Sequence, residues 1–411
     1  MHLLNKSIVD NCSERRFTMA THNAAGQMLG YLYQVRYALN LLLESNDPSY
    51  QISLEKFDDI AFDRDGTPVQ LIQAKHHTTP SSLTDTSTDL WRTLNVWVDA
   101  VKNDYSLLDN TDFVIITTAV APDNSAAKLI QQQKYQEAFE KLKDVIENSS
   151  NQTNTRFYDK IKSIGDSVLL RLVKRIRIIS SASDITDVEQ DIQKQIRYSC
   201  KLEHVPLATE RIEGWWFNEC IKALSSTNPV ITTYLQLHEK VYEITRQYGD
   251  DNLPIEFWDL DEVEEAELDP KDRIFMEQLR LLQFRSKTLH LALQDYYKAS
   301  KQRSSWLRQG LVYANQLDTY EHRLRDAWGH AFAEMEEDLE DYGNPTEQEK
   351  VKAGKSLYNK MMDQDIRIRP GVIAAYVMQG TYHHLANSLT IGWHVDFFDK
   401  LKHLLEGAGR Q

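Results

Sequence analysis

The segment from Gln51 to Lys75 constrains the fold more than any other part of the chain. It reads Q-I-S-L-E-K-F-D-D-I-A-F-D-R-D-G-T-P-V-Q-L-I-Q-A-K. An Asp65-Gly66 pair between two alternating runs is a strong signal for a β-hairpin. Because side chains two residues apart in a strand share a face, Gln73 and Lys75 should point the same way. The sequence therefore predicts a hairpin whose last strand ends in a polar pair.

Three carboxylates precede this pair: Glu55, and then Asp58 and Asp59, which we expect on the preceding strand. Such an order can place an acid, an amide oxygen and an ammonium around one divalent metal. Mg²⁺ prefers hard oxygen ligands and keeps several waters, and a lysine beside it can orient or deprotonate an attacking water. On spacing alone, a solvated strand face is the favoured interpretation, because short matches of common residues arise by chance.

The order of these residues is that of the PD-(D/E)XK nucleases, and Gln73-Ala74-Lys75 resembles the Q-x-K variant of their last motif. The resemblance implies a restriction-endonuclease-like domain. In several nucleases of this class a helix before the first strand delivers a Gln or Glu towards the metal. Gln34 or Glu44 could play that part here, and a polar residue on a solvated helix face is the alternative.

The first half of the chain alternates helical and extended patterns. The expected fold class is an α/β domain with a mixed sheet flanked by helices. An unbroken apolar run within 112–119 is typical of a central strand covered on both faces. Around the hairpin we expect helices at 24–44, 86–104, 125–149 and 184–197, and strands at 112–119 and 175–180.

The second half carries few strand signals and is expected to be mostly α-helical. At 411 residues, two domains are expected. We predict an extension at 1–20, a nuclease-like domain at 21–200 and a helical domain for partner docking at 205–411. The predicted helices of the second half are 207–226, 228–247, 270–300, 302–340, 345–362 and 385–406.

The composition points to the cytoplasm. Residues 1–18 lack the apolar core of a signal peptide, and Met19 is a second possible start. No run of 18 apolar residues exists, so no membrane span is expected. The three cysteines have no metal-type spacing, which fits a reducing compartment.

The charge distribution is uneven. A net charge of −14 argues weakly against nucleic acid, since phosphate binding needs a cationic surface. The stretch from Ile161 to Arg177 is basic, however, with a single acid, Asp166. It is the candidate DNA contact, through Arg171, Lys174, Arg175 and Arg177.

A motif near the C-terminus goes beyond composition. Residues 379–386, Q-G-T-Y-H-H-L-A, are followed by I-G-W-H at 391–394. Together they resemble the C-terminal domain of ABC-three-component defence systems, in which a helical domain docks on an SMC-like ATPase and a third small subunit. His383, His384 and His394 could suggest a metal. A packed corner, with no acidic partner at ligand spacing, is the favoured interpretation.

The first half of the chain resembles a matching domain, the double-stranded DNA endonuclease domain of CBASS effectors and of the LmuA effectors of Lamassu systems. The resemblance rests on residues 30–34, 54–60 and 73–76. It implies Asp59 as the metal-binding acid, with Asp58 or Glu55 as competitors, and Lys75 as the catalytic lysine. His76 closes the motif. The departure is Gln73, since a neutral amide holds metal less well than a carboxylate.

These resemblances imply a Mg²⁺-dependent, or Mn²⁺-dependent, DNA endonuclease effector of a Lamassu-type antiphage system. An SMC-like ATPase complex would hold it inactive and sense foreign DNA, and release would let it form an active homo-oligomer. One alternative is a catalytically inert adaptor that bridges the ATPase to DNA or to another effector. Another is a CBASS effector gated by cyclic nucleotides.

Overall fold

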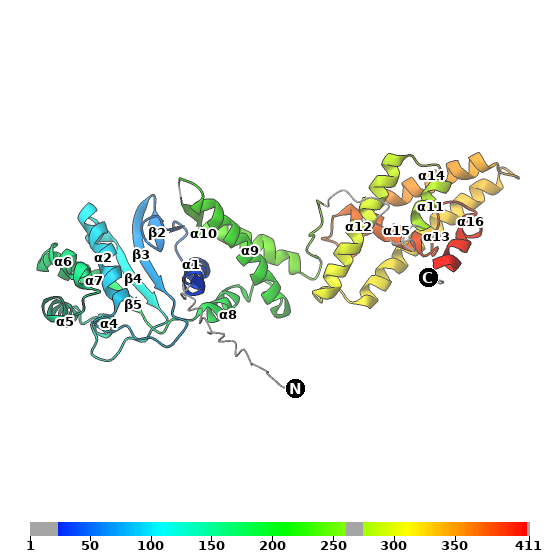
Figure 1. Ribbon diagram of the computed structural model, residues 1–411. Coiled ribbons are helices and arrows are strands. Elements are labelled where there is room, and N and C mark those ends of the chain that lie inside the picture. The colour runs from blue at the N-terminus through cyan, green and yellow to red at the C-terminus, as the bar shows by residue number, and fades with distance from the viewer. Residues whose placement is uncertain (1–23, 228, 260–273, 409–411) are drawn as a thin grey trace, which may run out of the picture. The chain divides into compact units, whose positions relative to one another are not determined.

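The protein divides into two compact units (Figure 1). The computed structural model describes residues 24–227, 229–259 and 274–408, so the predicted extension at 1–20 lies outside the described residues. The first unit contains 24–196 and 209–240 and is a mixed sheet flanked by helices. The second contains 197–208 and the described residues from 241 onwards, and it is mostly helical. The predicted fold class is confirmed.

The sheet of the first unit has six strands in the order β5-β4-β3-β2-β1-β6. Strands β3, β4 and β5 run parallel, and the other pairs are antiparallel. Lys75, the last residue of β3, pairs with Thr117, the last residue of β4, so both strands end at the same edge of the sheet. The strands are β1 Gln51–Leu54, β2 Ile60–Arg64, β3 Thr67–Lys75, β4 Asp112–Thr117, β5 Ile176–Ile179 and β6 Val230–Thr233.

The hairpin between β2 and β3 is confirmed. Arg64 pairs with Thr67 across the two-residue turn, and both turn residues have positive φ, 52° at Asp65 and 81° at Gly66. Two consecutive positive φ angles define the type I′ turn, whose twist matches that of the flanking strands. Asp-Gly is suited to this turn because both residues tolerate the left-handed region.

The expected strand position of Asp58 and Asp59 is wrong. Both lie in a loop at 55–59 between β1 and β2. Glu55 leaves β1 with φ 54°, and its N–H donates to the carbonyl of Asp59 at 3.3 Å, which closes the loop. Neighbouring side chains in a loop need not alternate between two faces. Asp58 and Asp59 can therefore both approach β3.

Helices cover both faces of the sheet (Figure 1). Helix α1 contacts β1 and β3 on one face and packs against α8. On the other face, Leu71 of β3 and Phe113 of β4 share a core with Trp97 of α2 and with residues of α5, α6 and α7. The helices are α1 Ala24–Glu44, α2 Thr88–Asn103, α3 Leu107–Asn110, α4 Ala126–Gln131, α5 Tyr135–Asn148, α6 Thr155–Lys162, α7 Asp166–Arg175 and α8 Ile185–Ile196.

Two further differences from the sequence prediction lie in this unit. The single helix expected at 125–149 is broken between α4 and α5, where Gln133 takes φ 60°. The region expected as a helix at 228–247 contains β6 before α10 (Tyr234–Thr245). The V-I-T-T sequence of β6 suits a strand, and β6 pairs with β1 to form one edge of the sheet. Because β6 completes the sheet, residues 209–240 belong to the sheet unit, beyond the boundary predicted at 200–205.

The remaining elements are helical, and none of the helices in the described ranges is long and apolar enough to cross a bilayer. Helices α12 and α15 make extensive contact, and they approach each other at Gly380. The elements are the 3₁₀ turns Leu202–His204 and Arg246–Tyr248, α9 Val205–Leu224, α10 Tyr234–Thr245, α11 Ile274–Leu281, α12 Ser286–Arg308, α13 Ala314–Glu340, α14 Glu347–Met362, α15 Ala375–Asn387 and α16 Phe397–Ala408.

Residues with positive φ also interrupt two of the helices predicted for the second half of the chain. Gln283, with φ 54°, separates α11 from α12 within the helix expected at 270–300. Leu389, with φ 53°, lies just after α15, so the helix expected at 385–406 is wrong and a loop at 388–396 precedes α16. The left-handed backbone region is conformationally unfavourable for residues other than glycine. The sequence pattern gives no warning of such breaks.

Candidate active site

Asp59, Gln73 and Lys75 form one hydrogen-bonded group at the carboxyl end of β3. Gln73 Nε2 donates to Asp59 Oδ1 at 2.9 Å, and Lys75 Nζ donates to Asp59 Oδ2 at 3.1 Å. Lys75 Nζ also donates to Gln73 Oε1 at 2.5 Å, and the backbone N–H of Ala74 donates to Asp59 Oδ2 at 3.2 Å. The structure therefore brings together the three residues that the sequence singled out as catalytic.

Asp58 joins this group from the inner side. It is buried, and its Oδ2 accepts a hydrogen bond from the indole Nε1 of Trp97 at 2.6 Å. Its Oδ1 accepts from Gln73 Nε2 and from the backbone N–H of Asp59. Burial raises the pKa of Asp58 to about 6, although the hydrogen bonds from Trp97 and Gln73 favour the ionised form. Both carboxylate oxygens are thus engaged within the protein.

Asp59 and Lys75 are more accessible to water than Asp58. Their side chains are 14% and 21% exposed. The group offers a carboxylate and the amide oxygen of Gln73, which are hard donors of the kind that Mg²⁺ binds while keeping several waters. The Lys75 ammonium already bonds to Asp59 Oδ2 and Gln73 Oε1, so these two oxygens are arranged to face a common cation. The residues present fit a divalent metal.

Glu55 lies at the solvent side of the same loop. Its side chain is exposed, yet partial loss of hydration and then the negative charge of Asp59 raise its pKa, against the effect of Lys75. The electrostatic coupling places Glu55 in the neighbourhood of both residues. A third carboxylate is therefore available near the group without being bonded into it.

Three further predicted residues lie elsewhere. His76 follows β3 and packs its ring against Tyr33 of α1, with 4.9 Å between ring centroids; burial lowers the pKa of His76. Gln34 is half-buried on α1, and within the described part of the chain no hydrogen bond joins it to the group. These contacts lie on the α1 side of the sheet. The face that carries Gln73 and Lys75 is the opposite one.

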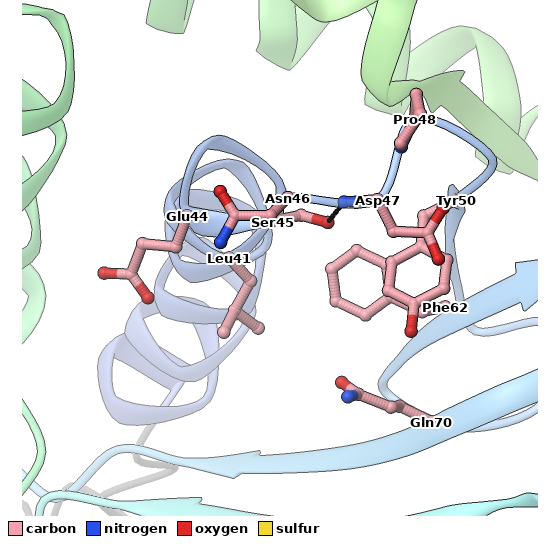
Figure 2. Close-up of a pocket in the computed structure, with 9 residues that line it drawn as sticks. All are labelled: Leu41, Glu44, Ser45, Asn46, Asp47, Pro48, Tyr50, Phe62 and Gln70. Atoms are coloured by element: carbon pink, nitrogen blue, oxygen red, sulfur yellow. Dashed lines mark hydrogen bonds between the residues drawn. The ribbon is translucent and has the colours of Figure 1, made fainter.

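Glu44 lies at a separate pocket on the α1 side. Glu44 is among the residues that line this pocket, together with Phe62 and Gln70, and Figure 2 shows its carboxylate at the end of α1, directed away from those two residues. The pocket has a volume of about 510 Å³. Gln70 is three residues from Gln73 in β3 and therefore points to the opposite face. The structure does not bring Glu44 to the catalytic group.

The basic segment is largely paired with acids. Arg171 bonds to Asp109 at 2.7 Å, and Arg177 lies 3.0 Å from Asp112. Arg175 Nη2 donates to the backbone carbonyl of Asp109, and its Nη1 lies 3.6 Å from Asp112. Lys174 is exposed, and it forms no ion pair among the described residues. Asp112 begins β4 and lies five residues, about 17 Å, before the Thr117 level of Lys75.

Trp97 is the residue that sequence reasoning missed. The pattern assigns it to the apolar stripe of α2, and it is indeed fully buried. Its indole N–H, however, bonds Asp58 across 39 residues of sequence. Nothing in the local pattern distinguishes it from Trp91, whose indole N–H bonds the backbone carbonyl of Asp85. Only the tertiary structure assigns the two tryptophans different partners.

The histidines of the C-terminal motif lie in the helical unit, and one expectation about them is wrong. His394 has acidic neighbours: its Nε2 is 3.3 Å from Glu347, and its Nδ1 is 3.9 Å from Asp396. These three residues are spaced as metal ligands could be. However, Lys400 and Lys350 bond the same two carboxylates at 2.9 Å.

The hydrogen bonding of His394 also disfavours a metal. Its Nδ1 accepts a hydrogen bond from the backbone N–H of Asp396 at 3.0 Å. A neutral imidazole whose Nδ1 accepts must carry its proton on Nε2, the nitrogen that faces Glu347. A metal ligand there would need an unprotonated Nε2. The cluster is better described as an ion-pair network that fastens α14 to the chain around α16.

Comparison with known proteins gives one match, in the helical unit. No curated protein and no solved structure matches this chain. Residues 275–401 match the family model of C-terminal domain 7 of the ABC-three component (ABC-3C) systems. The match covers the helices from α11 to α16, including the motif at 379–394. It supports membership of the protein in an ABC-3C defence system, in which it would work with partner subunits in a complex.

Proposed function

We propose that the protein is a metal-dependent DNA endonuclease, the effector of a Lamassu-type ABC-3C defence system. The observation that carries the proposal is the convergence of Asp59, Gln73 and Lys75 at the end of β3. Two of the residues share a strand, and the third reaches them from a loop 14 residues earlier. The match of the helical unit to an ABC-3C domain supports the setting.

The reaction would be hydrolysis of a phosphodiester. Bound by Asp59 and Gln73 Oε1, Mg²⁺ or Mn²⁺ would supply Lewis-acid stabilisation of charge on the scissile phosphate. Lys75, held by its hydrogen bond to Asp59, would orient the attacking water. The water oxygen would bond to phosphorus and release a proton to solvent, while the bond from phosphorus to the leaving sugar oxygen breaks and that oxygen takes up a proton from solvent. Asp58 would remain inside the protein and fix Gln73.

The charge of the chain supports control by partners. The chain carries a net charge of −14, and the arginines of its basic segment are paired with Asp109 and Asp112. Weak attraction of DNA to the isolated chain is the consequence. An SMC-like ATPase and a third subunit would hold the protein inactive until foreign DNA is sensed. Release and self-association into a homo-oligomer would then present several sites to double-stranded DNA.

Plasmid cleavage tests this proposal. The full chain is incubated with supercoiled DNA in Mg²⁺, in Mn²⁺ and in EDTA, over a range of protein concentrations, alone and with the two partner subunits and DNA ends. Cutting that needs the metal and rises more steeply than linearly with concentration supports a nuclease activated by self-association. If DNA stays intact in every mixture while the complex still assembles, the protein is an inert adaptor and the proposal fails.

A further inference from the structure

The orientation of the Gln73 amide is set by the carboxylates around it. Its Nε2 donates to both Asp58 Oδ1 and Asp59 Oδ1, and its Oε1 accepts from Lys75 Nζ. An amide carries donors on one branch and an acceptor on the other, whereas glutamate carries acceptors only. The site therefore matches glutamine in shape and in hydrogen-bonding polarity. Glutamate at this position would bring a third carboxylate against the two acids.

Asp58 is itself held in place. Trp97 of α2 is fully buried in the core of the sheet unit, and its indole N–H donates to Asp58 Oδ2 at 2.6 Å. The backbone N–H of Asp59 donates to Oδ1 at 3.0 Å. Rotation of the Asp58 side chain would leave the buried indole N–H without an acceptor, which is unfavourable. The carboxylate therefore has one favoured orientation, facing Gln73.

We propose that Asp58, clamped by Trp97, is a positioning residue that dictates glutamine at position 73 by fixing its amide so that Oε1 faces Lys75. The inference deepens the proposed function and rests on it for any effect on cleavage. Its structural part, the coupling between positions 58 and 73, stands independently of catalysis. It also explains how a neutral amide serves where a carboxylate would hold metal better.

The proposal predicts compensation between two unfavourable substitutions. Gln73→Glu places like charges in contact with buried Asp58, which disfavours ionisation and folding. Asp58→Asn alone points an NH₂ group either at the Gln73 NH₂ or at the indole N–H. In the double variant, the amide oxygen introduced at position 58 can still accept from Trp97, while the new NH₂ group donates to the carboxylate introduced at position 73. The donor and acceptor are exchanged between these two side chains, whereas the backbone N–H of Asp59 loses its acceptor and Asp59 Oδ1 loses its donor, so the compensation is partial.

A double-mutant cycle on the full chain tests this. Each single substitution should lower Tm by roughly 2–12 °C, since one buried polar contact is lost in a domain of this size. The double variant should lose clearly less Tm than the sum of the two single losses, because the contact between positions 58 and 73 is restored while those with Asp59 are not. Cleavage should follow the same order, with the double variant above both singles. If the two losses in Tm simply add, the coupling is absent and the proposal is overturned.

The clamp is tested separately with a matched pair of tryptophans on α2. Trp97→Phe removes the donor to Asp58, and Trp91→Phe removes a donor to the Asp85 carbonyl. Both variants therefore lose one indole hydrogen bond, which is buried at Trp97 and partly buried at Trp91. Both should lose a similar amount of Tm. Only Trp97→Phe should lower the cleavage rate at saturating DNA, by about tenfold or more, because misplaced catalytic groups slow the reaction. Equal cleavage by the two variants would overturn the clamp.

The two measurements separate the inference from the function on which it rests. If the original chain never cuts DNA, the proposed function fails, and the Tm cycle still decides whether Asp58 specifies residue 73. If the chain cuts DNA but the Tm losses add, the proposed function stands and the positioning role of Asp58 is rejected.

Discussion

The sheet unit and the helical unit each carry a polar motif, and the two motifs fold in opposite ways. At the end of β3, donors and acceptors from Asp59, Gln73 and Lys75 satisfy each other close to solvent. In α15, His383 is fully buried among Phe275 and Tyr358, and neither ring nitrogen has a hydrogen-bond partner within the described residues. Complementary polar groups that water can reach are suited to chemistry. Polar groups enclosed by rings are suited to packing.

The largest expected effect concerns the polar motif of the sheet unit. Lys75→Ala removes the ammonium from the catalytic group and should lower the cleavage rate by about 10²–10⁴-fold, the usual contribution of a positioned acid or base. Lys160→Ala is the matched control, because Lys160 also pairs with an aspartate, Asp99, on the surface of the same unit. Cleavage of plasmid by both variants, at matched folding, is the measurement. Equal rates would remove Lys75 from the mechanism.

The next effect concerns packing in the helical unit. A Cβ at Gly380 would collide with the backbone oxygen of Asp295 and with Ala299, where α12 and α15 touch. Gly380→Ala should therefore cost about 3 kcal/mol, at the upper end of overpacking. Gly329 is the matched control: it lies within α13 with open space at its Cβ position. Gly329→Ala should stabilise by up to about 1 kcal/mol through helix propensity.

Urea denaturation and assembly with the partner subunits check this prediction. Gly380→Ala should assemble poorly while the sheet unit keeps its catalytic group. If Gly380→Ala and Gly329→Ala unfold at the same urea concentration, the close approach of α12 and α15 at Gly380 is contradicted.

Much of the fold follows from local signals. The Asp65-Gly66 turn, the unbroken apolar strand β4 and the amphipathic helix α2 are all predictable, because hydrophobic period and turn chemistry decide them locally. The order of Asp59, Gln73 and Lys75 also carries a usable signal. Left-handed breaks such as Gln133 are not predictable, because the chain around them favours a helix and tertiary packing decides.

The polar contacts of the site are predictable only in part. Alternation within β3 places Gln73 and Lys75 on one face. The approach of Asp58 and Asp59 from a loop, and the bond from Trp97 to Asp58, join residues far apart in sequence. His394 is another such case, since its acidic neighbour Glu347 lies 47 residues away and no sequence motif indicates the contact. Long-range contacts of this kind depend on the whole fold.

A smaller expected effect concerns His383 in the C-terminal histidine motif and the pH dependence of stability. Burial, and then the neighbouring His384, lower the pKa of His383 to about 3. Because this value lies below that of the unfolded chain, the unfolded state takes up the proton first as pH falls. Stability is therefore present above pH 6.5 and is lost on acidification, by about 2 kcal/mol at pH 5 for this group. His383→Leu should remove that part of the pH dependence.

Unfolding by urea at pH 7 and pH 5 is the measurement, with exposed His330→Leu as the control that keeps the original pH dependence. At pH 7, His383→Leu should be nearly neutral, since it removes two unpaired nitrogens. A loss well above about 2 kcal/mol at pH 7 would mean that the ring has a partner worth keeping, and the packing interpretation would fail.

The smallest expected effect concerns DNA binding by the basic segment. It tests whether a cation that is already paired with a carboxylate of the chain is less available to a DNA phosphate. Arg171 is occupied by Asp109, whereas Lys174, three residues on, is exposed without an ion pair among the described residues. If DNA follows this face, Lys174→Ala should weaken binding a few-fold and reduce the salt slope by about 1, the value of one phosphate contact. Arg171→Ala should change the slope less, because its guanidinium already has a carboxylate. Titration of DNA at several salt concentrations distinguishes them, and an equal or larger change for Arg171→Ala would show that pairing within the chain does not withhold a cation from phosphate.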